Sequence, residues 1–200
     1  MRKVGIMGGT FNPIHNGHLT LAKEAYKQFS LDEVVFMPCG NAYMKAEQKV
    51  ESGQTRAKMT ALAIQDILHF TLSTIEIERK GNTYTYQTLE HLNRENPDTE
   101  YYYIVGADSL FNMTQWAFPE RIFSKCIILA AIRDDKTISD MEEEIRILRR
   151  KYDANVSLLH MSCMSISSSD IRRKVATGES IKGDVPESVR IYIEKRGLYR

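Results

Sequence analysis

The sequence has few of the residues that would mark an unusual protein. Its 200 residues include three cysteines, five prolines and one tryptophan, and 27 Lys and Arg nearly balance 26 Asp and Glu. Three cysteines without regular spacing, at Cys39, Cys126 and Cys163, form no disulfide framework and favour a reducing compartment. The formal net charge of +1 provides no overall attraction to nucleic acid or to an anionic membrane.

Long apolar runs are also absent. No run approaches the roughly 20 residues that a membrane-spanning helix needs. The first residues lead into a strand-like segment without the basic stretch and apolar region of a signal peptide. We therefore expect a cytoplasmic protein with neither nucleic acid nor membrane as a partner. The length and the hydrophobic content of 42% suit a single domain over residues 1–200.

Short strand-like runs alternate with helical patterns along the chain. Strands are expected at Val4–Met7, Val34–Met37, Leu72–Glu78, Tyr101–Val105, Cys126–Ile132 and Val156–His160. Two further helices follow the sixth run. This alternation predicts an α/β fold, a Rossmann-like doubly wound parallel sheet with helices on both faces and C-terminal helices. Ligands of such sheets bind beyond the carboxyl ends of the strands, at the switch point of the strand order.

The most specific motif, GGTFNPIHNGH at residues 8–18, directly follows the first expected strand. Gly8 and Gly9 allow a sharp turn and a close approach of the backbone to a ligand. His15 and His18 lie across the start of a helix, where free N–H groups and the helix dipole favour an anion such as a triphosphate. The alternatives are a plain turn with capping histidines, or half of a zinc site that no nearby carboxylate or cysteine completes.

A second motif, ISSSDIR at residues 166–172, follows the sixth expected strand. Serines at a helix start present hydroxyl and N–H groups to an anion, and Arg172 adds a planar charge in the first turn. The alternative is an ordinary N-cap with a solvated arginine. Combined with the first motif, it predicts a second side of the same phosphate site.

Together the two motifs resemble the signatures of the nucleotidyltransferase superfamily that carries His-x-Gly-His. Within it the chain is most similar to the bacterial nicotinate mononucleotide adenylyltransferases, over nearly its whole length. GADSL at residues 106–110, Trp116, NTYT at residues 82–85 and VPESV at residues 185–189 also match that family. One stretch departs from it, because Ala42-Tyr43-Met44-Lys45 stands where the family often has Pro-Pro-His-Lys.

This resemblance implies adenylyl transfer from ATP to nicotinate mononucleotide, giving deamido-NAD and pyrophosphate. The acceptor phosphate would attack the α-phosphorus directly and in line, without a protein nucleophile. Mg²⁺ would accompany ATP and needs few protein ligands, so no metal-binding residues are assigned. The residues implied to be catalytic are His15, His18, Lys45 and Arg172.

The resemblance also implies two sets of binding residues. Those for ATP are Gly8, Gly9, Thr10, Phe11, His15, His18, Gly106, Asp108, Ile166, Ser167, Ser168, Ser169 and Arg172. Those for the pyridine mononucleotide are Asn12, Lys45, Tyr84, Thr85 and Trp116. Trp116 would stack on the pyridine ring, although a core position is its alternative, and Asp108 would contact a ribose or the adenine side unless it is an N-cap.

Four other functions stay open. Relatives with the same histidine motif transfer adenylyl groups to nicotinamide mononucleotide or to phosphopantetheine. An aminoacyl-tRNA synthetase fragment has a related motif, but the near-neutral charge argues against it. The chain could also be a nucleotide sensor that binds ATP without chemistry. The retained His15, His18, Lys45 and Arg172 favour catalysis.

Overall fold

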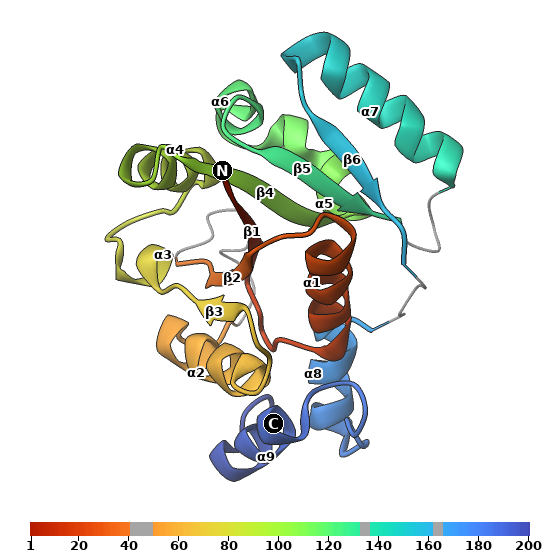
Figure 1. Ribbon diagram of the computed structural model, residues 1–200. Coiled ribbons are helices and arrows are strands. Elements are labelled where there is room, and N and C mark those ends of the chain that lie inside the picture. Colours follow the sequence, from red (N-terminus) through yellow and green to blue (C-terminus); the bar gives the residue numbers. More distant parts are fainter. Residues whose placement is uncertain (41–49, 133–136, 162–165) are drawn as a thin grey trace.

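The computed structural model describes residues 1–40, 50–132, 137–161 and 166–200 (Figure 1). In these residues six strands form a parallel sheet in the order β3-β2-β1-β4-β5-β6. The strands are β1 (Arg2–Gly9), β2 (Glu33–Pro38), β3 (Phe70–Leu72), β4 (Thr99–Gly106), β5 (Ile127–Ala131) and β6 (Val156–Leu159). The chain adds strands first on one side of β1 and then on the other, so the switch point lies between β1 and β4.

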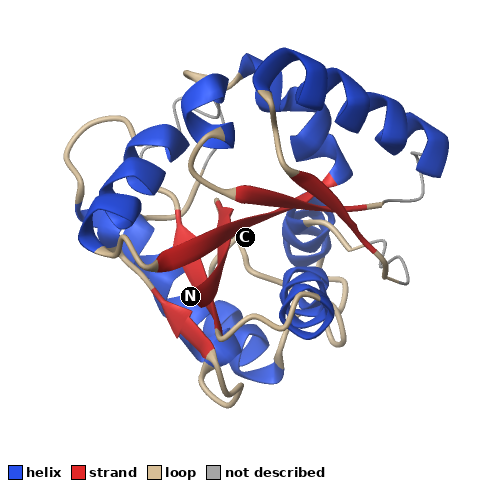
Figure 2. Cartoon of the chain, turned by 45° about the horizontal axis from the view of Figure 1, so that its top comes forward, coloured by secondary structure: helices blue, strands red, loops and turns tan. Residues whose placement is uncertain are grey.

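Helices cover both faces of this sheet, as predicted (Figure 2). One face carries α1 (Asn16–Gln28), α2 (Gly53–Ile64), α8 (Ser168–Thr177) and α9 (Glu187–Arg196). The other face carries α4 (Thr85–Glu95), α5 (Ala107–Asn112), α6 (Pro119–Phe123) and α7 (Ile138–Tyr152). Two short helices, α3 (Ile75–Glu78) and η2 (Met113–Gln115), lie in the connections. None of the helices in the described residues has the length and apolar character needed to cross a bilayer.

The strands are apolar on both sides because each face of the sheet has its own core. In β5, Leu129 and Ala131 pack in the core on the α1 side, whereas Ile128 and Ala130 pack in the core on the α7 side. A fully buried Leu or Ile contributes roughly 1.5–3 kcal/mol relative to an exposed one. Continuous apolar runs such as that of β5 therefore hold the two helix layers to one sheet.

The predicted strand Leu72–Glu78 is wrong. The strand is Phe70–Leu72, and Ile75–Glu78 forms the short helix α3. Alternation of Ile75 and Ile77 with two glutamates suggested one buried and one exposed face. In the structure Glu76 is buried and both isoleucines are only partly covered. The alternation therefore does not correspond to one buried and one exposed face of a strand.

Candidate active site

The larger of two described cavities lies at the carboxyl ends of β1 and β4, at the predicted switch point. Its volume is about 500 Å³. The cavity contacts the ends of three strands and the first residues of α1 and α8. The predicted ATP-binding residues that line it are Gly8, Gly9, Thr10, Phe11, His15, His18, Gly106, Asp108, Ile166, Ser167, Ser168, Ser169 and Arg172.

The two histidines of the first motif form a stacked pair at the start of α1. His15 is the N-cap residue and is buried, while His18 is half-buried in the first turn. Their ring centroids are 3.7 Å apart, with an angle of 27° between the planes. The backbone N–H of His15 donates to Nδ1 of His18 at 3.2 Å. A neutral His18 therefore carries its ring hydrogen on Nε2, which makes that atom a hydrogen-bond donor.

Gly8 and Gly9 serve a different purpose from the sharp turn that was predicted. Both belong to β1, and the chain turns only afterwards, at Phe11, whose φ is 49°. A side chain at position 8 would collide with the hydroxyl group of Tyr103 on β4. Glycine at this position therefore leaves room for the side chain of Tyr103 at the carboxyl edge of the sheet.

The loop between β1 and α1 is fixed through Asn12. Its side-chain oxygen accepts hydrogen bonds from the backbone N–H of Glu51, at 3.2 Å, and from the hydroxyl of Tyr199, at 2.9 Å. Asn12 is buried and precedes a cis peptide bond to Pro13. It lines the larger cavity, and its side-chain oxygen is engaged in holding the loop. Its role in substrate binding stays a prediction.

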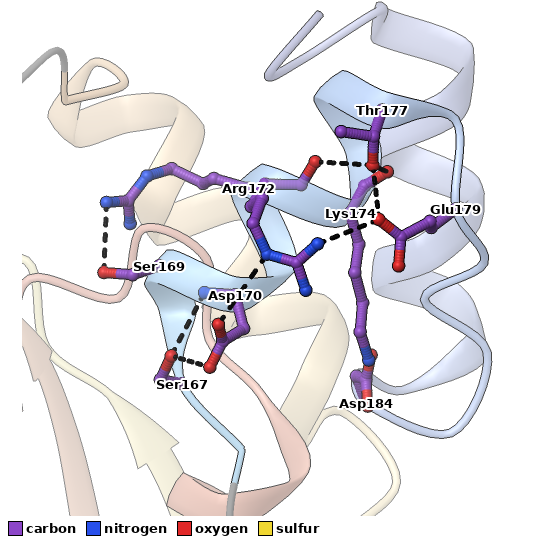
Figure 3. A network of polar contacts seen from close by, with 9 residues as sticks. Ser167, Ser169, Asp170, Arg172, Lys174, Thr177, Glu179 and Asp184 are labelled. Atoms are coloured by element: carbon purple, nitrogen blue, oxygen red, sulfur yellow. Dashed lines mark hydrogen bonds and ion pairs between the residues drawn. The ribbon is translucent and has the colours of Figure 1, made fainter.

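The second motif begins α8 and is hydrogen-bonded to this same loop. Ser167 is the N-cap residue, and its Oγ accepts a hydrogen bond from the N–H of Asp170 at 3.1 Å (Figure 3). Ser168 Oγ donates to the carbonyl of Pro13 at 2.9 Å. Arg172 Nη1 donates to the carbonyl of Asn12 at 2.9 Å. Two motifs separated by about 150 residues are therefore brought to one cavity, as the sequence predicted.

The segment after α8, at Gly183 and Asp184, is hydrogen-bonded to the first turn of α1. Lys174 Nζ forms an ion pair with Asp184 Oδ2 at 2.7 Å (Figure 3). The carbonyl of Asp184 accepts a hydrogen bond from the backbone N–H of Asn16 at 2.9 Å. Asn16 Nδ2 donates to the carbonyl of Gly183 at 2.8 Å. These contacts fix the position of α1 relative to α8, and with it the spacing of the donors on both sides of the cavity.

A second cavity of about 390 Å³ adjoins the first. Both cavities are lined by Gly8, Gly9, Thr10, Tyr103, Asp108, Ser109 and Trp116. The predicted acceptor residues Tyr84 and Thr85 line the second cavity, at the N-terminus of α4. Trp116 is half-buried and meets the ring of Tyr103 edge-on, with centroids 6.2 Å apart. It is thus neither a fully buried core residue nor a surface residue.

The structure adds two buried charged residues that the sequence did not single out. Arg56, which is 3% exposed, donates to the carbonyls of Thr10, at 2.7 Å, Cys39, at 2.7 Å, and Glu51, at 3.0 Å. Glu76 lines the second cavity and accepts a hydrogen bond from Thr88 Oγ1 at 2.8 Å. Burial raises the pKa of Glu76. Neither residue belongs to a recognisable motif.

Several predictions concern residues outside the described ranges. Lys45, predicted to be catalytic and substrate-binding, is one of them, together with the other residues of the departing stretch, Ala42, Tyr43 and Met44, and with Cys163. Within the described ranges, no group of three or more His, Cys, Asp and Glu side chains is placed to hold a metal ion. The larger cavity is lined by both apolar side chains and hydrogen-bond donors such as His18 and Arg172, with Asp108 as its carboxylate among the described residues.

Comparisons with known proteins agree with this geometry. The family model described as cytidylyltransferase-like matches residues 6–174. A protein of Lachnoclostridium phytofermentans named probable nicotinate-nucleotide adenylyltransferase is 47% identical over 199 residues, covering 100% of both chains. A protein of the same name from Clostridium botulinum is 40% identical over 200 residues, covering 100% of this chain and 99% of the relative.

Solved structures show the same fold. Nicotinic acid mononucleotide adenylyltransferase of Plasmodium falciparum, complexed with NaAD, aligns with a TM-score of 0.82 at 19% identity. That alignment covers 100% of this chain and 98% of the other. Since the family model and the full-length relatives agree, the chain belongs to the cytidylyltransferase-like family and, within it, to the nicotinate-nucleotide adenylyltransferases.

Proposed function

We propose that the chain transfers the adenylyl group of ATP to nicotinate mononucleotide, giving deamido-NAD and pyrophosphate. The observation that carries this proposal is the pair of adjoining cavities at the switch point. The larger cavity is lined by groups that can donate hydrogen bonds to phosphate, such as His18 and Arg172. The smaller cavity is lined by Trp116 and the N-terminus of α4. The names of the full-length relatives support the same activity.

In the larger cavity the phosphates of ATP would lie between the first turns of α1 and α8. Nε2 of His18 would donate a hydrogen bond, and Arg172 would provide a fixed positive charge. His15 would hold the ring of His18 in place by stacking. Lys45 is proposed as a further cation. Asp108, which lines both cavities, would contact a ribose or the adenine side.

The reaction would be a direct displacement. An oxygen of the acceptor phosphate forms a bond to the α-phosphorus of ATP, while the bond from that phosphorus to the bridging oxygen of the β-phosphate breaks. The bridging oxygen leaves with pyrophosphate, so no protein nucleophile and no covalent enzyme intermediate is needed. The protein would accelerate the reaction by holding the two substrates in line and by stabilising the charge that develops on the phosphates.

A divalent cation fits this site as a companion of ATP. We propose Mg²⁺, which favours phosphate oxygens and water over an all-protein cage. When bound, it would neutralise charge on the triphosphate and on the leaving pyrophosphate. The donor groups of α1 and α8 would bind phosphate oxygens in the same cavity.

In the smaller cavity Trp116 would stack on the pyridine ring. The backbone N–H groups around Tyr84 and Thr85, at the start of α4, would hold the nicotinate carboxylate. The shared lining around Gly8 and Thr10 would then bring the acceptor phosphate to the α-phosphorus of ATP.

The proposal is tested by measuring pyrophosphate release from Mg²⁺–ATP with nicotinate mononucleotide and nicotinamide mononucleotide side by side. We expect release with both substrates present and a clear preference for the acid. Preference for the amide would make nicotinamide mononucleotide the substrate. If neither mononucleotide supports release, phosphopantetheine is tested next, and release with it would assign the chain to another branch of the family. ATP binding without release in any mixture would indicate a sensor. We further propose that residues 1–200 act as one domain in the cytoplasm.

A further inference from the structure

Glu76 places a buried carboxyl group against the smaller cavity. The residue is 9% exposed and lines the cavity. Its Oε1 accepts a hydrogen bond from Thr88 Oγ1 at 2.8 Å, and Arg79 Nη1 donates to the same hydroxyl at 3.1 Å. The carboxyl group is also close enough to Tyr103 to raise the pKa of that phenol, although burial has the larger effect. The group therefore lies in the acceptor cavity and not on the surface of the molecule.

The hydrogen bond from Thr88 links Glu76 to the part of the cavity proposed to hold the nicotinate carboxylate. Thr88 belongs to the first turn and a half of α4, and its backbone N–H donates to the carbonyl of Tyr84 at 3.3 Å. Thr85, at the start of the same helix, makes a side-chain hydrogen bond with Tyr103. An acidic side chain and an acidic substrate would thus lie at the same helix N-terminus.

The groups around the smaller cavity determine how strongly Glu76 acts on a bound substrate. Among the described residues that line it, Glu76 and Asp108 carry carboxyl groups, and burial raises the pKa of the Tyr103 phenol. Burial has the largest effect on the pKa of Glu76 and raises it, whereas Arg79 is close enough to act in the opposite direction. Two negative groups that meet in a protein cavity repel each other more strongly than they do in water.

We propose that Glu76 determines how strongly the acceptor cavity prefers a pyridine ring that carries a carboxylate over one that carries a carboxamide. An ionised Glu76 opposes the carboxylate and is indifferent to the neutral carboxamide. A protonated Glu76 removes that repulsion and can donate a hydrogen bond to the ring substituent. The inference rests on the proposed function, because it concerns the acceptor of the same reaction.

The direction of the effect with pH follows from this arrangement. Burial raises the pKa of Glu76, so the proton is lost at a higher pH than from an ordinary glutamate. Preference for the acid is expected to be greatest at low pH, where Glu76 is neutral. It falls as the pH rises through the pKa of Glu76.

The test is the ratio of kcat/KM for nicotinate mononucleotide to kcat/KM for nicotinamide mononucleotide, measured from about pH 5 to about pH 9. Both acceptors carry the same phosphate and react with the same ATP complex, so titration of those groups cancels in the ratio. We expect the ratio to fall with pH in the wild-type protein. In Glu76→Gln, which keeps an oxygen for Thr88, it is expected to be independent of pH and about tenfold higher at the alkaline end.

A matched control is Glu78→Gln, which removes a charge from the same short helix at an exposed position. Its ratio is expected to follow that of the wild-type protein. Equal ratios in Glu76→Gln and the wild-type protein at every pH would overturn the inference. If the variant does not fold, a pH-independent ratio in the wild-type protein has the same consequence. Absence of pyrophosphate release with both acceptors would instead reject the proposed function itself.

Discussion

The hydroxyl of Tyr199 donates a hydrogen bond of 2.9 Å to the side-chain oxygen of Asn12, which lies 187 positions earlier in the sequence. Burial raises the pKa of Tyr199, so the phenol stays protonated and able to donate. The backbone carbonyl of Asn12 accepts a hydrogen bond from the guanidinium group of Arg172. The loop that leads into α1 is therefore held by two residues from the other end of the sequence.

Tyr199→Phe removes the hydroxyl and leaves the ring. We expect the free energy of unfolding to fall by about 1 kcal/mol, the usual contribution of one such bond. Pyrophosphate release is expected to slow by about two- to tenfold, because the loop loses one of its anchors. Chemical denaturation and steady-state kinetics measure the two effects. The control is Tyr192→Phe, because the ring of Tyr192 packs on the same core. Equal losses of stability and activity in the two variants would contradict the prediction.

His18→Ala removes the proposed donor from Nε2. Loss of one preorganised donor to the developing charge lowers the rate by about 10²–10³ in comparable sites. We expect that loss in kcat, with ATP binding by calorimetry much less affected. His160→Ala, an exposed histidine whose backbone groups bind Gln28, is the control. Turnover close to that of the wild-type protein would reject the assignment of His18 as catalytic.

Arg172 and Arg173 offer a matched pair on consecutive positions of α8. Arg172 lines the larger cavity, whereas Arg173 is exposed and forms an ion pair with Glu179. Arg172→Ala is expected to raise the KM for ATP about tenfold or more, since a charge-assisted contact to phosphate is lost. Arg173→Ala is expected to leave the KM within about twofold, because exposed ion pairs contribute little. Similar KM values for both variants would place the phosphates elsewhere.

Trp116→Ala tests the acceptor cavity. Removal of a stacking surface is expected to raise the KM for the pyridine mononucleotide by about tenfold or more, since stacking on an aromatic ring contributes roughly 1–3 kcal/mol. The KM for ATP is expected to change much less. Phe118→Ala is the control, because that ring is 53% exposed. Equal changes in both KM values would show a general disturbance of the fold instead of a lost contact with the acceptor.

Arg56→Met tests the buried cation beside Thr10 and Cys39. The backbone carbonyls of Thr10, Cys39, Gly40 and Glu51 would lose this donor, so we expect the free energy of unfolding to fall by about 3 kcal/mol. Urea denaturation measures this loss. Lys58→Met, an exposed position on the same helix, is expected to have almost no effect. A loss below about 1 kcal/mol in Arg56→Met would show that water replaces the guanidinium.

The sequence predicted the layers of the fold because long apolar runs and amphipathic helices have clear periods. It failed at Ile75–Glu78, since one helical turn is too short to show a 3.6-residue period and mimics alternation. The sequence predicted a turn at Gly8, which instead belongs to β1 and leaves room for a side chain of the neighbouring strand β4. That side chain is Tyr103, whose hydroxyl would collide with a side chain at position 8.

The site was predictable where a local motif carries the chemistry. The histidines at the start of α1 and the serines at the start of α8 can be recognised in the sequence, because each group follows a predicted strand. Arg56 and Glu76 cannot be recognised in this way, because each acts through partners that only the folded chain brings near, such as Thr10 for Arg56. Buried charges of this kind have no sequence pattern of their own.

The phosphate cavity takes its two sides from α1 and α8, and this has a consequence for a chain that is still being made. All six strands precede α8 in the sequence, so a growing chain could complete its sheet before Ser168 and Arg172 have been synthesised. Such an intermediate has the histidines but lacks the helix that faces them across the cavity. ATP would therefore act as a ligand only for the finished protein, and its binding would favour the docking of α8 over its release.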